Sequence, residues 1–427
     1  MFKKGSTMNF KMKHIALVVA LMPLNQAFAG EVESRIEALE AKFSQLEQQR
    51  VQDVQQVQQL QETAQKETKK PSVYSDTDIK FYGIVRVDGA IDFKDTASPQ
   101  FVSGQIPSVD YTPAGNRSAF TITATRLGMD MAKKIKGTDV KAKIEMDFWD
   151  GLEGNGKLRL RHAYVDFDNW LIGQTVSNMS NLETLTESVD YTLFMGYSWT
   201  RLPQVRYNFN LAPAHNIKVA AEYVDTRASE IPAVTAKYVY NKDDLTLVTQ
   251  GFAHEKRATL KVDGQEKDID KWGWGVGLGF KYKLSPVNSI QAHVYHVEGD
   301  QKFVSYTQQS GGTLNGYSSG GDFSVNAEQN DLDQNKVNTY VLGYSHKLSE
   351  QWRTNFAASL IDFDSSTSYA RNNPTMNKQL SDIAANIFYT PVQNVDVGLE
   401  YHHGERKQFD GKSFDISRVN FVTTYKF

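Results

Sequence analysis

Apolar and polar residues alternate along most of the chain from Ile79 onward. In the last stretch, Phe421 and Phe427 fall on one face of a strand while Arg418 and Lys426 fall on the other, because successive side chains of a strand point to opposite faces. The alternation predicts an all-β region of sixteen strands, at 79–93, 119–132, 138–149, 158–168, 170–177, 201–211, 216–225, 233–241, 244–255, 272–284, 288–298, 336–348, 352–363, 380–390, 395–406 and 414–427.

The connections between these strands alternate in length. Short turns near 133–137, 285–287 and 349–351 lie between long segments near 94–118, 178–200, 256–271, 299–335 and 364–379. Short turns on one side and long loops on the other are typical of outer-membrane barrels. A soluble β-sandwich or propeller is the alternative, and it does not predict this asymmetry. We therefore expect residues 79–427 to form a transmembrane antiparallel β-barrel of 16 strands.

The two ends of this region fit a closed barrel. Its last strand must pair with its first, since a closed sheet leaves no backbone edge unpaired in lipid. Phe427 then serves as an aromatic anchor at the membrane interface. Both ends fall on the short-turn side, which we expect to face the periplasm.

A different pattern precedes the barrel. Val32, Ile36, Leu39, Phe43 and Leu46 recur at spacings of four and three, and Val57, Leu60 and Ala64 continue the register. Such a/d heptads are typical of a coiled coil. We expect a self-associating helix at 30–68, in the periplasm, and a linker at 69–78. The alternative is a lone solvated helix or a disordered linker.

The composition of the chain indicates the cellular compartment of the protein. Residues 1–29 have a basic start, an apolar core and the end Ala27-Phe28-Ala29, as in a secretory signal peptide. No later run approaches the ~20 apolar residues of a spanning helix. The chain has no cysteine, which fits an exported protein and excludes disulfides. Without the four lysines of the signal peptide, 47 − 4 = 43 basic residues face 50 acidic ones, and this balance argues against a nucleic-acid partner.

Charged residues share the face opposite the apolar one, so they would line the lumen. The predicted substrate-path residues are Arg86, Arg126, Arg159, Arg161, Arg206, Lys218, Arg353 and Arg418. Acids occur on the same faces, among them Glu145, Asp147, Asp382 and Glu400. For any single arginine, the alternative is a wall residue paired to such an acid.

The third long loop, 178–200, carries Glu183, Glu187, Asp190 and Tyr191. If it folds inward it faces the arginines and forms a constriction with opposed charges. The stretch 272–282 alternates glycines with aromatic and aliphatic residues. Its spacing is strictly two, so it is no nucleotide loop. It predicts lipid-facing aromatics backed by a flat lumen wall, against which a folded-in loop could lie.

Enzymatic and metal sites find little support. His402 and His403 are adjacent on a strand, so they face opposite sides and cannot share a metal ion. The chain contains no H-E-x-x-H, G-x-S-x-G or phosphate-loop motif. We therefore expect no catalytic residue, no metal ligand and no cofactor.

Several motifs in residues 79–210 resemble a known family. They are Phe81-Tyr82-Gly83, Arg126-Leu127-Gly128, the run 158–165, Leu171-Ile172-Gly173-Gln174-Thr175 and the run 202–207. With the N-terminal heptads, the chain resembles the DcaP-like porins. The resemblance implies a trimeric outer-membrane channel for dicarboxylates and other small anions, with a periplasmic coiled coil before a sixteen-stranded barrel. Val176 stands where members often have tryptophan.

Three functions follow as hypotheses. The leading one is a homotrimeric porin, assembled through barrel walls and coiled coil in outer-membrane lipid, that passes small anionic solutes. The second is a sugar-type or general porin, whose lumen would carry an aromatic track; Tyr82, Trp149 and Tyr295 are its candidates. The third is a structural or adhesive barrel that acts through the Gly- and Ser-rich loop 299–335.

Overall fold

The computed structural model describes residues 26–67, 77–94, 117–149, 156–224, 229–262, 264–304, 313–314, 317–318, 321–326, 328 and 330–427. The chain divides into two units, Met1–Ser75 and Asp76–Phe427. Residues 1–25 of the predicted signal peptide, most of the predicted linker and most of the loop 94–118 lie outside the described residues.

The first unit contains one long helix, α1 (Gln26–Glu67), which agrees with the helix predicted at 30–68. At 1.5 Å per residue its 42 residues extend over roughly 60 Å. Phe43, Leu46 and Val57 of the predicted seam are exposed. Self-association of the helix stays a prediction. None of the helices in the described part of the chain has the length and apolar character of a membrane span.

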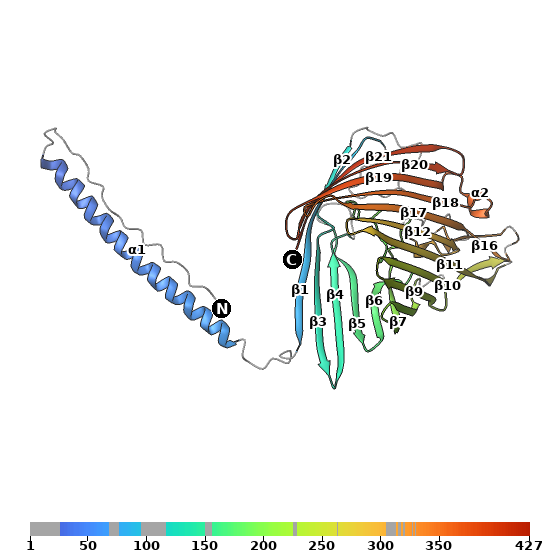
Figure 1. Ribbon diagram of the computed structural model, residues 1–427, viewed down its shortest axis with the longest axis horizontal. Helices are drawn as coiled ribbons and strands as arrows, with labels where there is room; N and C mark the ends of the chain where they lie inside the picture. The colour runs from blue at the N-terminus through green and yellow to red at the C-terminus, as the bar shows by residue number, and fades with distance from the viewer. Residues whose placement is uncertain are drawn as a thin grey trace. The chain divides into compact units, whose positions relative to one another are not determined.

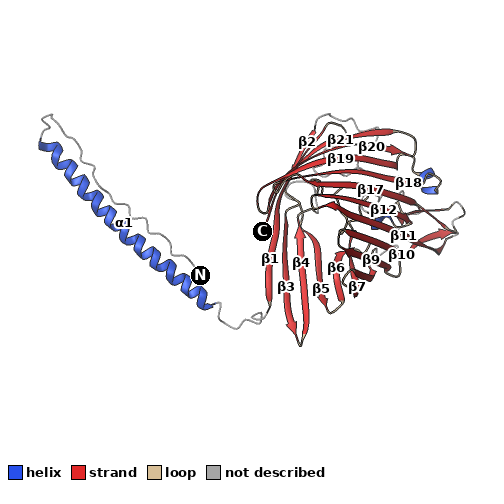
Figure 2. Cartoon of the chain, in the orientation of Figure 1, coloured by secondary structure: helices blue, strands red, loops and turns tan. Residues whose placement is uncertain are grey.

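The second unit is a sheet of antiparallel strands in which consecutive strands pair, except that β2 and β3 both pair with β1 (Figures 1 and 2). Its strands are β1 (Asp78–Asp92), β2 (Arg117–Thr121), β3 (Arg126–Ile135), β4 (Thr138–Asp147), β5 (Arg159–Phe167), β6 (Trp170–Val176), β7 (Arg201–Ala212), β8 (His215–Glu222), β9 (Ala233–Lys242), β10 (Leu245–Val262), β11 (Gln265–Ser285), β12 (Asn288–Glu298), β17 (Lys336–Lys347), β18 (Trp352–Phe363), β19 (Asn377–Val392), β20 (Val395–Gln408) and β21 (Ser413–Lys426).

The sheet closes on itself because β21 pairs with β1, from Ile84 opposite Lys426 to Asp92 opposite Arg418. Beyond the last strand, Phe427 exchanges two backbone hydrogen bonds of 3.1 Å with Gly83. The predicted closure of the last strand onto the first is confirmed.

The sheet has seventeen strands, but β2 and β3 both pair with β1, so they form one wall strand and the barrel has 17 − 1 = 16. The predicted number is therefore confirmed, while the predicted continuous second strand is interrupted. At the gap, the Thr125 hydroxyl accepts from the Arg86 backbone N–H at 3.1 Å and donates to the Arg86 carbonyl at 3.2 Å. A side chain thus replaces the missing ladder bonds.

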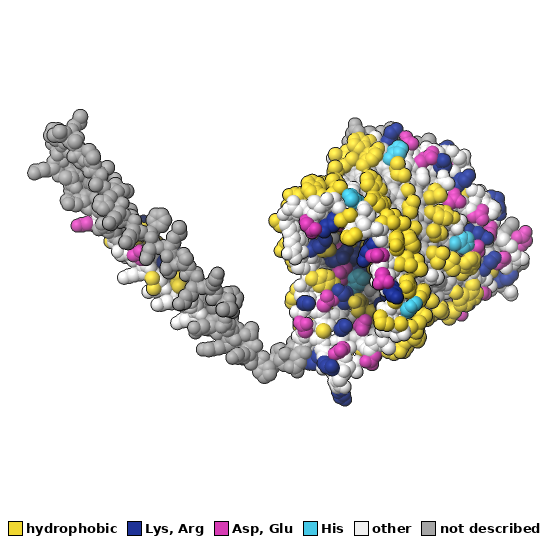
Figure 3. All heavy atoms as spheres, in the orientation of Figure 1, with side chains coloured by type: hydrophobic (Ala, Val, Ile, Leu, Met, Phe, Trp, Pro, Cys, Tyr) yellow, Lys and Arg dark blue, Asp and Glu magenta, His cyan; other side chains and the backbone are white. Residues whose placement is uncertain are grey.

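The outer face of the wall is apolar. On β11, Trp272, Trp274 and Leu278 are exposed while the glycines between them face inward, as the sequence predicts. Figure 3 shows hydrophobic side chains gathered in a band over the strands. Exposed apolar surface of this extent indicates a non-aqueous surrounding.

Two long loops differ from expectation. Most of the predicted loop 256–271 is strand, because β10 and β11 continue outward as one hairpin. Ala258, Leu260 and Ile269 of that hairpin pack against residues of the loop 299–335, which stabilises its extension. The loop 299–335 is itself structured where it is described, with η2 (Gln301–Phe303), β13 (Thr313–Leu314), β14 (Tyr317–Ser318), β15 (Phe323–Val325) and β16 (Leu332–Gln334). The loop 364–379 contains α2 (Ser368–Asn372).

Candidate functional site

The loop between β6 and β7, residues 177–200, runs inside the barrel. Lys237 of β9 donates to the Ser180 carbonyl at 2.9 Å, and Asn386 of β19 donates to the Glu187 carbonyl at 2.8 Å. Between them, His293 of β12 lies 2.9 Å from the Thr184 carbonyl. Since these strands are distributed around the wall, the loop must follow the inner surface across several of them. Whether this loop enters the barrel was open from the sequence, and the structure places it inside.

Glycines in the wall make room for this loop. A Cβ on Gly279 of β11 would lie 1.8 Å from Asn181 Nδ2, and one on Gly343 of β17 would lie 1.8 Å from Thr186 Oγ1. Any side chain at these positions would force Asn181 and Thr186 of the loop to move. The flat lumen wall predicted from the glycine alternation in 272–282 is therefore confirmed.

A buried carboxylate on β20 holds the middle of the loop. Glu400 accepts hydrogen bonds from the Ser188 hydroxyl at 2.9 Å and from the backbone N–H groups of Val189 at 3.0 Å and Asp190 at 2.9 Å. The His402 ring bridges Glu400 at 2.9 Å and Asp382 at 2.8 Å. Hydrogen bonds to a charged acceptor in a low-dielectric site are strong, so this cluster fixes the loop's position.

The tip of the loop crosses to the strands on the other side. The Tyr191 hydroxyl donates to Asp147 Oδ2 at 2.8 Å and accepts from Arg161 Nη1 at 2.5 Å. The Tyr191 and Trp149 rings lie 4.6 Å apart between centroids. Arg86 of β1 donates to the Val189 carbonyl at 2.5 Å while it also binds Asp88. The loop is therefore attached to strands around much of the wall.

Two acids neutralise the arginines of β3 and β5. Arg161 binds Glu145 at 2.6 Å and Asp147 at 2.9 Å. Arg159 binds Asp147 with two nitrogens, and Arg126 lies 3.4 Å from Glu145. The Arg161 side chain is only 2% exposed, against 20% for Arg126 and 32% for Arg159. Arg161 is thus a paired wall residue, whereas Arg126 and Arg159 still reach solvent.

Arg418 and Arg353 also hold structure together. Arg418 is fully buried and binds Asp92 across the closing seam, at 2.5 and 2.8 Å, so it faces no open path. Arg353 of β18 binds both oxygens of Glu187 at 2.7 and 2.8 Å, which ties the loop to a third part of the wall. For Arg161 and Arg418, the alternative of a wall residue paired to an acid fits the geometry better than a place in the lumen.

The start of the loop forms its own charge cluster. Glu183 lies 2.6 Å from Lys237 and 4.0 Å from Lys218. Burial raises the pKa of Glu183, but the two ammonium groups outweigh it, so the net pKa lies below the usual range. Glu183 is therefore ionised at neutral pH. Lys218 keeps 27% of its side chain exposed.

Two arginines of β7 differ from the rest. The side chains of Arg206 and Arg201 make no hydrogen bond or ion pair with any residue that the structure describes, although Glu222 and Asp166 lie within electrostatic reach of Arg206. Arg201 stacks on Trp199 at 4.9 Å and lies within electrostatic reach of Arg161 and Arg159. Arg206 was predicted as a path residue, and Arg201 was not. Strict alternation puts Arg201 on the opposite face from Arg206, and only its place at the end of the inward loop could have identified it.

The arrangement is an inward loop whose Glu183 and Glu187 pair with Lys237 and Arg353 of the wall, with two further arginines on β7 that form no ion pair. Figure 3 shows a hollow in this unit, in which Lys and Arg gather with Asp and Glu. Among the described residues, no group of three or more His, Asp or Glu side chains could hold a metal ion. Such a site can attract and orient a small anion, since clustered charges act strongly where a water-filled passage narrows.

Comparison with known proteins gives one family and several similar folds. The sequence model of the DcaP outer membrane protein family matches residues 31–427. The crystal structure of the outer membrane channel DcaP of Acinetobacter baumannii is 29% identical, with a TM-score of 0.72, and the match covers 83% of this chain and 98% of that one. No curated protein matches.

Two further structures share the fold at low identity. The anion-selective porin from Comamonas acidovorans is 12% identical, with a TM-score of 0.54, over 82% of this chain and 100% of that one. OmpT of Vibrio cholerae is 10% identical, also with a TM-score of 0.54, over 82% and 98%. At this identity the likeness concerns the barrel alone.

Proposed function

The chain belongs to the DcaP outer membrane protein family and is an outer-membrane channel, and we propose that it lets small organic anions, dicarboxylates among them, diffuse through the barrel. The observation that supports this most is on β7. The side chains of Arg201 and Arg206 make no ion pair or hydrogen bond with the described residues, whereas the other arginines of the neighbouring wall are paired. The narrow part of the lumen therefore carries surplus positive charge.

The position of this charge matters more than its amount. A sixteen-stranded barrel holds water, so an isolated wall charge is screened over about 8 Å at physiological salt. Charges discriminate between solutes only where the passage narrows, and the loop 177–200 narrows it beside β5 and β7. Arginine suits this role because its guanidinium can bind a carboxylate with two hydrogen bonds and does not lose its charge.

We assign different roles to the predicted path residues. Arg206, Arg126 and Arg159 guide the solute, together with Arg201. Lys218 and Arg86 flank the passage, and Arg353 holds Glu187 of the loop. Arg161 and Arg418 stabilise the tip contact and the closing seam. The interaction with each solute must stay weak, because a solute that binds tightly is not released. No catalysis and no cofactor enter this mechanism.

A sugar-type porin is less well supported. Its aromatic track would need accessible rings in a row along the lumen. Tyr82 is bonded to Lys143 and Glu145, Trp149 packs against Tyr191, and Tyr295 is fully buried. Each of these three rings is held by its own contacts in the wall or the loop, so they do not form an accessible row.

We further propose that the channel is a homotrimer, associated through its apolar barrel walls and through α1. Both ends of the barrel lie at its short-turn end, since the chain enters at Asp78 and leaves at Phe427 near the turn 393–394. If that end faces the periplasm, as in the sequence-based topology, α1 is periplasmic too. The exposed Phe43, Leu46 and Val57 support association of the helix.

Liposome swelling tests the proposed solute class. Purified protein in liposomes should admit butanedioate faster than a neutral sugar of similar size. Arg206→Glu should slow the entry of butanedioate and leave the rate of sugar entry unchanged. Lys378→Glu, at an exposed lysine, carries the same charge change and should alter neither rate. Equal rates for the two solutes in the wild type would contradict anion preference. No swelling at all would favour the structural or adhesive alternative.

A further inference from the structure

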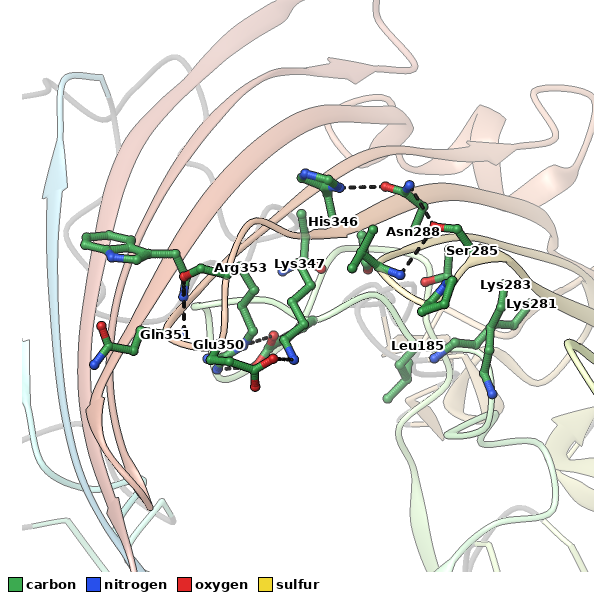
Figure 4. A pocket seen from close by; sticks show the side chains of 18 residues that line it. Leu185, Lys281, Lys283, Ser285, Asn288, His346, Lys347, Glu350, Gln351 and Arg353 are labelled. Carbon is green, nitrogen blue, oxygen red and sulfur yellow. Dashed lines mark hydrogen bonds and ion pairs between the residues drawn. The ribbon is translucent and has the colours of Figure 1, made fainter.

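A second basic site lies at the short-turn end of the barrel, apart from the arginines of β3, β5 and β7. A cavity of about 380 Å³ opens there. It is bounded by β11, by the turns that precede β12 and β18, and by the edge of the loop 177–200. Figure 4 shows Lys281 and Lys283 on one side of it, beside Leu185 of the loop, with Lys347, Glu350 and Arg353 on the other side.

The charges on the two sides of the cavity differ. Lys347 is bound to Glu350 at 2.9 Å, and Arg353 is bound to both oxygens of Glu187. Lys281 and Lys283 make no side-chain hydrogen bond or ion pair with the described residues. The cavity therefore has two positive charges in excess, and both stand on β11.

The fold explains why these lysines stand there. Gly273, Gly275, Gly277 and Gly279 face the lumen, and the loop lies against the last of them. Lys281 and Lys283 continue the same face toward the short turn, beyond the point where the loop passes from β11 to β17 near Leu185. They are thus the first inward side chains of β11 that a solute meets after the constriction.

The spacing suggests the kind of ligand. Residues two apart on a strand share a face and their Cα atoms lie roughly 7 Å apart. Two flexible ammonium groups at that spacing can hold the two ends of a small dianion together. Lysine side chains exposed to water bind such a ligand weakly, which suits a site that must release it.

We propose that Lys281 and Lys283 form a second binding site for small dicarboxylates at the short-turn end, one that the solute occupies on the side opposite the long loops. This inference rests on the proposed anion channel. It adds that the channel is asymmetric: a dicarboxylate reaches this site without crossing the constriction only from the short-turn side.

Single-channel recording of the full-length protein tests this site. Butanedioate is added to each side of the bilayer in turn, and the frequency and duration of current blockages are measured. We expect more frequent blockages from the short-turn side than from the other side in the wild type. In Lys281→Gln/Lys283→Gln we expect that side's blockages to shorten by about two- to tenfold, as for the loss of two exposed ion pairs. Acetate, with one charge, should be affected less.

Lys242→Gln is the matched control, because Lys242 is an exposed lysine at a turn of the same end and does not line the cavity. Equal blockage times in the double variant, the control and the wild type would overturn the second site. A double variant that instead lost block by an acidic peptide, with butanedioate unaffected, would also overturn it. A wild type that prefers cations would refute the anion channel itself, so the two failures are distinguishable.

Discussion

The hydroxyl of Tyr191 donates a 2.8 Å hydrogen bond to Asp147, and this contact joins the tip of the inward loop to the opposite wall. Tyr191 comes from the loop 177–200 and Asp147 from the end of β4. Arg161 completes the contact, because it donates to the Tyr191 hydroxyl and binds Asp147 directly. This tyrosine hydroxyl is therefore one of the contacts that fix the tip of the loop, among buried charges.

Removing that hydroxyl should loosen the loop. Tyr191→Phe keeps the ring against Trp149 but removes a hydrogen bond to a charged group, worth about 1.5–3 kcal/mol. We expect more frequent current fluctuations in single-channel recordings and a higher mean conductance. Tyr223→Phe, at an exposed tyrosine, is the matched control. Identical current traces for Tyr191→Phe and wild type would show that the tip contact does not set the width.

The closing seam provides a second prediction. A Cβ on Gly83 would lie 2.5 Å from Phe427 Cζ and 2.6 Å from the Arg126 carbonyl oxygen. Gly83→Ala should therefore destabilise the barrel by about 1–3 kcal/mol through overpacking. Gly89→Ala on the same strand is the control, since its nearest neighbour would be 3.8 Å away. Thermal unfolding, followed by the heat-dependent shift in gel mobility, should separate the two variants. Equal unfolding midpoints for the two variants would mean that the Phe427 ring moves aside with no loss of stability.

Asp190 makes the docking of the loop depend on pH. Burial raises the pKa of Asp190 to about 6, although His402 and the hydrogen bonds from Thr192 act in the opposite direction. Glu400 also faces it and adds to the rise, Asn420 of β21 donates to it, and Arg86 binds the neighbouring Val189 carbonyl. Ionisation of this buried carboxylate therefore makes docking of the loop less favourable.

The direction of the pH dependence follows from a comparison of the docked and the free loop. Above about pH 6 Asp190 is ionised whether the loop is docked or free, and the cost is complete. Between about pH 6 and pH 4 the docked loop takes up the proton first, so acidification favours docking, by on the order of 2 kcal/mol. We expect fewer loop openings at pH 5 than at pH 7, counted as current fluctuations. Asp190→Asn should remove this difference. Glu183, whose pKa is lowered, titrates below this window. More openings at pH 5 in the wild type would contradict the assignment.

The helix can be tested on its own as a peptide. Residues 31–65 should be helical and oligomeric, with helicity that rises with concentration, because the seam buries apolar surface only when helices associate. Circular dichroism and sedimentation measure both properties. Phe43→Ser/Leu46→Ser should abolish association. A monomeric, unfolded wild-type peptide would count against the coiled coil and leave trimerisation to the barrel walls.

Periodicity predicted the wall well, because each wall residue meets either an apolar surrounding or the lumen. β12 and β18 were predicted at 288–298 and 352–363, the spans that they have in the structure. Interactions between distant segments were not visible in that pattern. The continuation of β10 and β11 depends on Phe323 and Leu332, far along the chain. The break between β2 and β3 depends on the Thr125 hydroxyl.

The candidate site was predictable in kind but not in detail. The alternation identified which arginines face inward, and the glycines of β11 indicated where a loop could lie. It could not say which arginines keep an acid partner, because pairing depends on register and on loop contacts. Arg161 is neutralised by Glu145 and Asp147, whereas Arg201, which alternation placed on the outer face, lies near the cluster.

The sign of ion selectivity tests the central proposal most directly. It is measured as the reversal potential of purified protein in planar bilayers across a potassium chloride gradient. We predict that the wild type favours chloride and that Arg201→Glu/Arg206→Glu shifts the potential toward potassium, while Lys378→Glu leaves it unchanged. A wild type that favours potassium, or a double variant with the wild-type potential, would contradict the claim that the unpaired arginines of β7 select anions.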